Sequence, residues 1–363
     1  MIPANRDQAL DGLRGAAAIM VVYLHFVSTS GMLAAPGGGQ LGVVIFFVLS
    51  GFLITRILWS RPEQGLRQSW TDFVRRRARR LYPPIIVILA ICGPLMALAD
   101  VPADNGQHLF ATAIVLTQSA APFAAANAMP IEWWGHTWSL SIEWCFYLSW
   151  PLAVWLMRRR GLQSQRASVW TGATALALFA GSLFLSPRFF YFLPPANIAA
   201  MLVGAALALR EVEQGQRPAR GRLADVAAIG LVAIVALPSN MPGLWAYRVT
   251  HFPFAIVVTV LLISTRHATQ SLAQMLLRSR PLVAIGRASY SLYLWHFPLL
   301  AIIWFGFSSL APEVRVIIAV CMLPFPVWLS YRYIELPRLR SIEGARKHQI
   351  DTSGARSELG VTP

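Results

Sequence analysis

Residues 11–26 read DGLRGAAAIMVVYLHF, an apolar run that an arginine opens and that contains a histidine. Of the 363 residues, 56% are hydrophobic and 13% are charged, whereas a soluble domain carries about a quarter charged residues. Few charges combined with long apolar runs are typical of membrane proteins. A cleaved signal peptide is the competing interpretation, and it would need a histidine inside its hydrophobic segment. We therefore interpret this stretch as the first of several membrane spans.

Ten apolar runs are long enough to cross about 30 Å of hydrocarbon as helices that rise about 1.5 Å per residue. They lie near 13–33, 41–59, 82–100, 138–157, 169–186, 191–209, 223–239, 249–265, 288–309 and 314–334. An eleventh run, 108–121, is short and partly polar. The expected fold class is therefore all-α, a polytopic membrane protein with about ten transmembrane helices. Residues 1–340 would form the membrane-embedded domain, and the polar tail 341–363 is expected to be disordered.

The basic residues predict how the chain is oriented. With ten spans and both termini in the cytoplasm, all but three of the 31 basic residues lie on the cytoplasmic side, and those three are Arg188, Arg248 and Arg315. If 108–121 also crossed, every later loop would change sides and this asymmetry would disappear. We therefore expect a multi-pass protein of the cytoplasmic (inner) membrane, with 101–137 outside. The net charge of +15 does not indicate nucleic-acid binding, because the arginines lie between apolar runs.

The first run carries a pair of ionisable residues. Arg14 and His25 are about three helical turns apart, so they share a helix face at a separation of about 16 Å. Intramembrane ionisable residues are usually functional, although an anchoring arginine and a packing histidine would fit the same spacing. Within HTWSLSIEWCFYLSW (136–150), Glu143 shares a face with Ser139 and Tyr147. We expect Glu143 to pair with His25 across the bundle.

Two further motifs carry reactive or charged groups. SYSLYLWHFP (289–298) places Ser289, Tyr293 and His296 at i, i+4 and i+7, where an aromatic belt at the membrane interface is the alternative. DFVRRRARRLYPP (72–84) holds five arginines within six residues. Their planar guanidinium groups suit phosphate recognition, but anionic lipid headgroups attract the same cluster.

These motifs have a direction. The arginines lie on the cytoplasmic side, and the histidine and glutamate, which suit general-base work, lie some 15–20 Å deeper by helix rise. A long phosphorylated carrier whose reactive end is far from its phosphates would bridge them, and coenzyme A has that shape. The three cysteines show no CxxC or metal-site spacing, so we expect no metal.

At these residues the chain resembles the acyltransferase 3 family of integral membrane O-acyltransferases, from about residue 7 to 338. DGLRGAAAIMVVYLH resembles its Arg-x10-His motif, and GVVIFFVLSGFLI resembles its second-span block. FVRRRARRLYP resembles its Arg-x-x-Arg-x-x-Pro block, and TWSLSIEWCFY its Ser-Leu-x-x-Glu-x-x-Phe-Tyr block. SYSLYLWHFP and YRYIELP, with Glu335, resemble the closing blocks. Val44 departs from the pattern, because the family often has an aspartate there.

The resemblance implies site residues. It makes His25 and Glu143 catalytic and assigns donor binding to Arg14, Arg77 and Arg80. The supporting residues that the motifs contribute are Ser50, Ser139, Tyr147, Tyr293 and His296. Many relatives carry a soluble hydrolase-like domain after the last span, and we expect this chain to act as a stand-alone transferase.

The expected activity is transfer of an acyl group, with acetyl-CoA as the expected co-substrate, to a hydroxyl of a cell-envelope or secreted glycan. No permanently bound cofactor is expected, and the partners are acyl-CoA, a glycan or glycolipid acceptor and membrane lipids. A secondary metabolite or a lipid headgroup is the alternative acceptor. A proton-coupled transporter is the alternative of another class, although the two halves of the chain show no similarity. Direct transfer by His25 as a base and a covalent acyl-histidine both fit the sequence.

Overall fold

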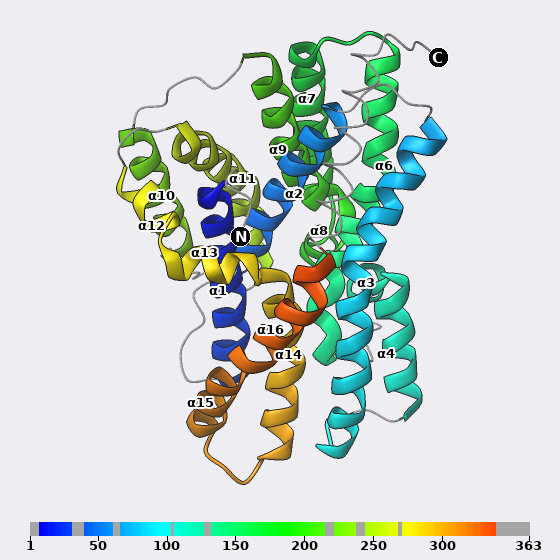
Figure 1. The fold of residues 1–363 in the computed structure, drawn as a ribbon, viewed down its shortest axis with the longest axis vertical. Helices are drawn as coiled ribbons and strands as arrows, with labels where there is room; N and C mark the ends of the chain where they lie inside the picture. The colour runs from blue at the N-terminus through cyan, green and yellow to red at the C-terminus, as the bar shows by residue number, and fades with distance from the viewer. Residues whose placement is uncertain are drawn as a thin grey trace.

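The computed structural model describes residues 7–30, 40–60, 66–102, 105–126, 132–214, 221–236, 244–267 and 271–338. Helices make up nearly all of these segments and no β-strand occurs in them, which confirms the all-α class (Figure 1). The predicted tail 341–363 lies outside the described residues. The elements are α1 (Gln8–Ser30), α2 (Leu41–Trp59), α3 (Leu66–Leu98), α4 (Asn105–Thr117), α5 (Ala120–Ala125), η1 (Glu132–Thr137), α6 (Trp138–Arg159), α7 (Ser164–Ser182), α8 (Pro187–Phe192), α9 (Pro194–Gln214), α10 (Gly221–Ala236), α11 (Leu244–His267), α12 (Leu272–Leu277), α13 (Arg280–Arg287), α14 (Ser289–Gly306), α15 (Pro312–Met322), α16 (Pro324–Leu329) and η2 (Ser330–Glu335), a π-helical turn.

Seven helical segments are long and apolar enough to cross a membrane, which supports a multi-pass membrane protein. They are Gln8–Thr29, Leu41–Trp59, Trp70–Leu98, Trp133–Arg159, Pro194–Val212, Tyr247–Arg266 and Pro312–Arg338. An eighth span exists only if α13 and α14, which are bent by 73° to one another, count as one.

The predicted number of about ten spans is therefore not confirmed. The two remaining runs are helical but fall short, because α7 begins with polar residues and α10 has only 16 residues in the part that the structure describes. The run 108–121 is interrupted at Gln118, whose φ is 57°, so α4 ends after 13 residues. The cytoplasmic position of the two termini stays a prediction.

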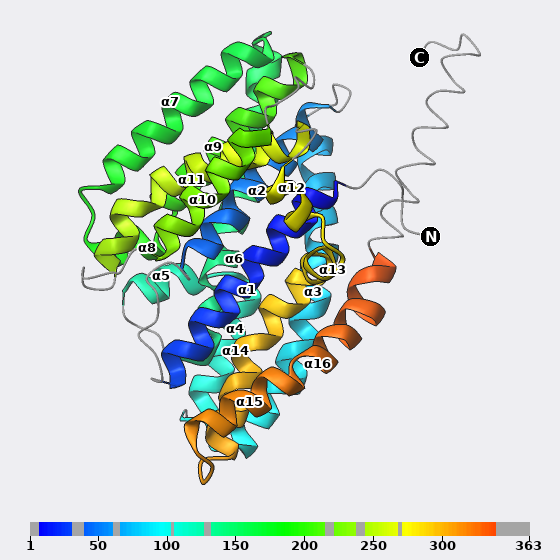
Figure 2. The same cartoon turned by 90° about the vertical axis from the view of Figure 1, so that its left-hand side faces the viewer.

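Helix α2 lies at the centre of the bundle, and 13 of its 19 residues are buried. Figure 2 shows α1 and α2 between α7 on one side and α16 on the other. α2 crosses α9 at glycines: a methyl group at Gly51 would lie 1.8 Å from the Met201 carbonyl oxygen, and one at Gly204 would lie 2.0 Å from that of Val48. The helix backbones therefore touch, and this crossing fixes the position of Ser50.

Helix α1 is held in the same way against α12 and α13. A methyl group at Gly12 would lie 1.7 Å from the Leu277 carbonyl oxygen, and one at Gly286 would lie 1.7 Å from that of Asp11. The Asp11 carboxylate also pairs with Arg287 at 3.2 Å. Small residues that let helix backbones approach are common in membrane bundles. The glycine pattern around Arg14 thus serves helix packing.

The three arginines that the topology places outside all bond to backbone carbonyl groups near helix C-termini. Arg188 donates to the Ala124 and Ala125 oxygens at the end of α5, with distances of 2.7 to 3.1 Å. Arg248 donates to a carbonyl just after α7, and Arg315 donates to three carbonyls at the end of α14. Because terminal carbonyl groups lack helical partners and carry negative partial charge, these exceptions to the charge asymmetry have a structural reason.

Candidate active site

A cavity opens among α1, α2, α3, α6 and α14, with about 920 Å³ of space between its walls, including its open mouth. Eight of the ten residues that the sequence predicted for the site line this cavity. They are Arg14, Ser50, Arg77, Arg80, Ser139, Glu143, Tyr147 and Tyr293. Segments as far apart in sequence as α1 and α14 therefore meet around one space. His25 and His296 are not part of its wall.

Three arginines give one side of the cavity its positive charge. Arg77 and Arg80 are three residues apart on α3, which puts them on the same helix face. The Arg77 guanidinium lies over the Phe73 and Tyr147 rings, 5.3 and 5.4 Å from their centroids. Within the described residues, neither Arg77 nor Arg80 forms an ion pair or a side-chain hydrogen bond. These two charges are therefore available to a ligand.

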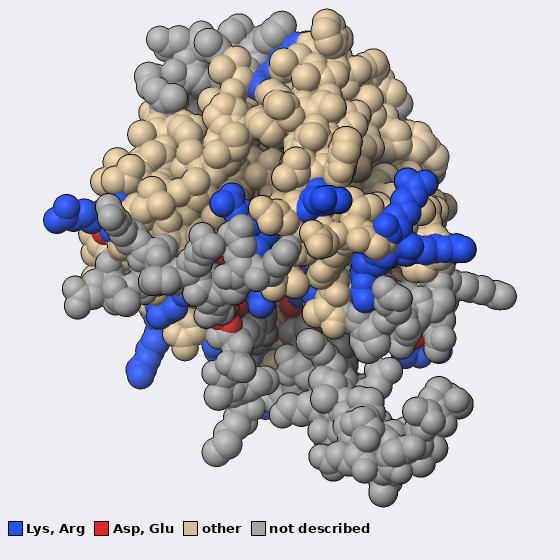
Figure 3. All heavy atoms as spheres, turned by 90° about the horizontal axis from the view of Figure 1, so that it is seen from above, with Lys and Arg blue, Asp and Glu red and all other residues tan. Residues whose placement is uncertain are grey.

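The third arginine links the cavity to the bend before α14. Arg14 donates a hydrogen bond to the Ser289 hydroxyl at 2.9 Å. The arginine band continues on the outside of the molecule: seen from the top of Figure 1, arginine side chains extend across the whole face (Figure 3). An anion that approached this face would meet positive charge before it reached the cavity.

Glu143 is the single carboxylate in the cavity wall. It accepts hydrogen bonds from the Ser50 hydroxyl at 2.9 Å and from the Tyr147 hydroxyl at 2.5 Å. It forms no hydrogen bond with His25 in the described structure, so the expected Glu143–His25 pair is wrong. The helix faces were predicted correctly, but α6 presents its carboxylate to α2 and α3 instead of to the histidine.

The partner of His25 is another histidine. His25 Nδ1 lies 3.1 Å from His296 Nε2 and 3.0 Å from the Val21 carbonyl oxygen. The His25 ring also packs on Phe297, with 4.6 Å between ring centroids. The Arg-x10-His pair of α1 is thus matched on α14, where Ser289 contacts Arg14 and His296 contacts His25.

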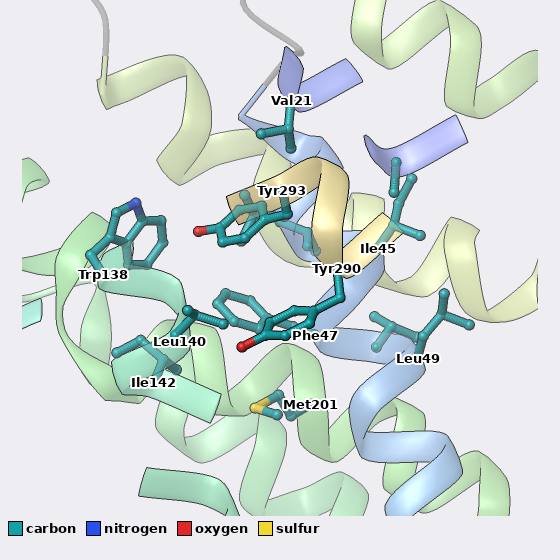
Figure 4. Packing of buried hydrophobic residues seen from close by; sticks show 14 of the residues in the cluster. Val21, Ile45, Phe47, Leu49, Trp138, Leu140, Ile142, Met201, Tyr290 and Tyr293 are labelled. Carbon is teal, nitrogen blue, oxygen red and sulfur yellow. The ribbon is translucent and has the colours of Figure 1, made fainter. Parts of the chain in front are cut away.

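Tyr293 lies between the cavity and the histidines. Its hydroxyl is 2.8 Å from the Ser139 hydroxyl in the cavity wall, and it also donates to the His136 carbonyl oxygen. Its ring centroid lies 5.2 Å from that of His136 and 5.8 Å from that of His296. Figure 4 shows Tyr290 and Tyr293 extending from α14 toward α6. The site therefore has two compartments, a cationic cavity and a histidine cluster, with Tyr293 at their boundary.

The sequence interpretation missed His136. This residue lies in η1, its ring centroid is 5.2 Å from that of His296, and both of its ring nitrogens are buried without a hydrogen-bond partner. The available signal was its position directly before the apolar run that contains Glu143. No group of histidine, cysteine, aspartate or glutamate side chains in the described segments could hold a metal ion.

Glu335 is placed differently from the other family residues. It is buried in η2 and accepts a hydrogen bond from the Ser291 hydroxyl at 2.9 Å. It does not line the cavity. Its position indicates that it connects η2 to α14 behind the site.

Comparison with known proteins agrees with these motifs. The family described as "Acyltransferase domain" matches residues 7–331. O-acetyltransferase OatA of Staphylococcus aureus (strain NCTC 8325 / PS 47) is 26% identical over 348 residues, which covers 90% of this chain and 56% of OatA. The protein SACOL0978 of S. aureus (strain COL) is 28% identical over 356 residues, with the same shares covered. This chain thus spans little more than half the length of these relatives. No solved structure matches it. Because the family match covers most of the sequence, the chain belongs to the acyltransferase 3 family.

Proposed function

We propose that the protein is an O-acyltransferase of the cytoplasmic (inner) membrane that moves an acyl group, acetyl above all, from acyl-CoA to a hydroxyl group of a cell-envelope or secreted glycan. The carrying observation is the cavity in which Arg14, Arg77 and Arg80 face a single carboxylate, Glu143. The histidine cluster next to it supplies the base. The printed names of the relatives, O-acetyltransferases, support acetyl as the group and oxygen as its acceptor.

The cavity suits the phosphate and pantetheine parts of the donor. Arginine binds phosphate through two parallel N–H bonds, and charge-assisted bonds of this kind are the stronger hydrogen bonds in proteins. The opposite wall is apolar, with Val43, Phe46 and Leu53 from α2. A flexible pantetheine arm could lie along this wall while the arginines hold the phosphates. Its thioester end would then point to Tyr293 and the histidines.

In the proposed reaction, His25 removes the proton from the acceptor hydroxyl as its oxygen attacks the thioester carbonyl carbon. The C–S bond breaks, and the leaving thiolate takes the proton to give free CoA. α1 is continuous from Gln8 to Ser30, so Arg14 and His25 keep their separation of about 16 Å along the axis. Glu143 contributes by orienting Ser50 and Tyr147 and by balancing part of the arginine charge before the donor binds.

The orientation and the acceptor belong to the same proposal. Donor binding from the cytoplasm requires the arginine face to be inside, and a glycan acceptor would approach His25 from the other side of Tyr293. A secondary metabolite, a lipid headgroup and a transported anion are the alternatives. They differ in what happens to the thioester, because only a transferase couples its cleavage to an acceptor.

The proposal is tested with membranes that contain the protein and acetyl-CoA labelled in its acetyl group. We expect release of CoA and appearance of label in an alkali-labile ester on envelope glycan, with both lost in His25→Ala. A wild-type protein that leaves the thioester intact, or that moves labelled anion across vesicles without cleaving it, would contradict the proposal.

A further inference from the structure

The hydrogen bonds of His296 indicate which of its ring nitrogens carries the proton. Its Nδ1 lies 2.6 Å from the Tyr293 carbonyl oxygen, one turn earlier in α14. A carbonyl oxygen only accepts hydrogen bonds, so Nδ1 is the nitrogen that bears hydrogen. In the neutral ring, Nε2 of His296 is therefore an acceptor, and it faces His25.

The same argument continues to His25. Its Nδ1 has two neighbours, the Val21 carbonyl oxygen at 3.0 Å and His296 Nε2 at 3.1 Å. Both neighbours accept, so the hydrogen of neutral His25 lies on Nδ1 and its Nε2 is unprotonated. This Nε2 forms no hydrogen bond within the described residues, and it is not among the enclosed atoms that lack a partner, unlike both nitrogens of His136. It is the ring atom open to a substrate.

We infer that His296 is the positioning residue for His25, in place of Glu143: it fixes the tautomer that leaves Nε2 of His25 free, and it stabilises the positive charge that forms there. The inference rests on the proposed acyl transfer. It assigns to His296 the task that a carboxylate performs for many catalytic histidines.

The proton balance is complete with these two rings. Nε2 of His25 takes the proton of the acceptor hydroxyl, and the ring becomes positively charged. Its Nδ1–H remains hydrogen-bonded to His296 Nε2, which can take that proton and so share the charge. When the C–S bond breaks, the proton on Nε2 passes to the sulfur, and both histidines return to their neutral forms. The Val21 carbonyl can orient the ring but cannot accept the proton.

The geometry argues against the alternative partners of His25. Both oxygens of Glu143 are used by Ser50 and Tyr147, and Glu143 lines a cavity that does not include His25. His136 approaches the cluster through its ring, but neither of its nitrogens has a hydrogen-bond partner. Only the His296 ring both touches His25 and has a nitrogen that can hold a proton.

Two substitutions separate an acceptor atom from packing. His296→Gln keeps an acceptor oxygen near the position of Nε2, whereas His296→Phe keeps a ring and removes the acceptor. We expect His296→Phe to lower the turnover number by about 10² to 10⁴, the range for loss of general-base function, and to leave the KM for acetyl-CoA within about twofold. His296→Gln should retain at least tenfold more turnover than His296→Phe.

The matched control is His251→Phe. His251 is another buried histidine, on α11, whose ring packs on Tyr247 and Phe190 and whose nitrogens lack partners. We expect its turnover to be that of the wild type. Normal turnover in His296→Phe would overturn the inference, and so would equal losses in His296→Gln and His296→Phe at equal membrane levels. A wild-type protein without transfer activity would instead contradict the proposed function.

A spectroscopic measurement tests the tautomer without any reaction. In protein labelled with ¹⁵N in its seven histidines, the His25 signals are identified by their loss in His25→Ala. We expect neutral His25 to show hydrogen on Nδ1, and this state to be lost in His296→Phe. Hydrogen on Nε2 of His25 in the wild type would overturn the inference.

Discussion

The arginine run RRRARR (75–80) offers a direct test of the cavity, because its members face different surroundings. Arg77 and Arg80 line the cavity, whereas Arg79 is exposed and does not. If Arg77 binds a donor phosphate, Arg77→Ala removes a charge-assisted hydrogen bond worth about 1.5–3 kcal/mol. At about 1.4 kcal/mol per factor of ten, the concentration of acetyl-CoA required should rise about 10- to 150-fold.

Arg79→Ala is the matched control, since it removes the same charge from the same helix. Acetyl transfer is measured against acetyl-CoA concentration in membranes with equal amounts of each variant. Arg79→Ala should behave as the wild type, and Arg77→Lys should recover only part of the loss because a lysine cannot form the two-pronged bond. If Arg77→Ala and Arg79→Ala raise the requirement equally, or neither raises it, the run serves attachment to lipid headgroups and the donor site lies elsewhere.

Three other predictions follow from the topology, the helix crossings and the base. In a protein without native cysteines, a membrane-impermeant thiol reagent applied to whole cells should label Ala126→Cys and spare Arg160→Cys; the reverse pattern would contradict the predicted orientation. Gly51→Ala forces a methyl group into a carbonyl of α9, so it should lower the thermal midpoint and the yield of folded protein, whereas Gly172→Ala, which meets no atom within 4 Å, should not; equal stability of the two would refute the close crossing. His25→Ala should lower transfer by about 10² to 10⁴ and leave CoA binding unchanged, and near-normal turnover would make this ring a packing residue.

The helix periodicity was enough to identify most of the cavity wall. Ser139, Glu143 and Tyr147 repeat every fourth residue, and the structure places all three on the same space. Periodicity fixes a helix face, but it does not say which neighbour that face meets. The distance from Glu143 to His25 depends on how α6 is rotated against α1, and no local pattern encodes this rotation. For that reason the carboxylate was paired with the wrong group.

The number of spans was overestimated for a similar reason. Apolar runs such as 169–186 and 223–239 mark helices correctly, but a run of that length can pack at the edge of a bundle without meeting the length and apolarity of a span. His136 was missed because it precedes an apolar run and belongs to no helical repeat. Its neighbours on α14 are 157 and 160 residues away in sequence, and only the fold brings them together.

The position of Tyr293 has a consequence for the energised membrane itself. An enzyme that takes one substrate from each face needs two openings, and two openings joined by water would conduct protons down their gradient. Tyr293, bonded to Ser139 and to the His136 backbone, occupies the place where the two openings would join. The aromatic plug lets chemistry meet in the middle of the bilayer while the cell keeps its proton-motive force.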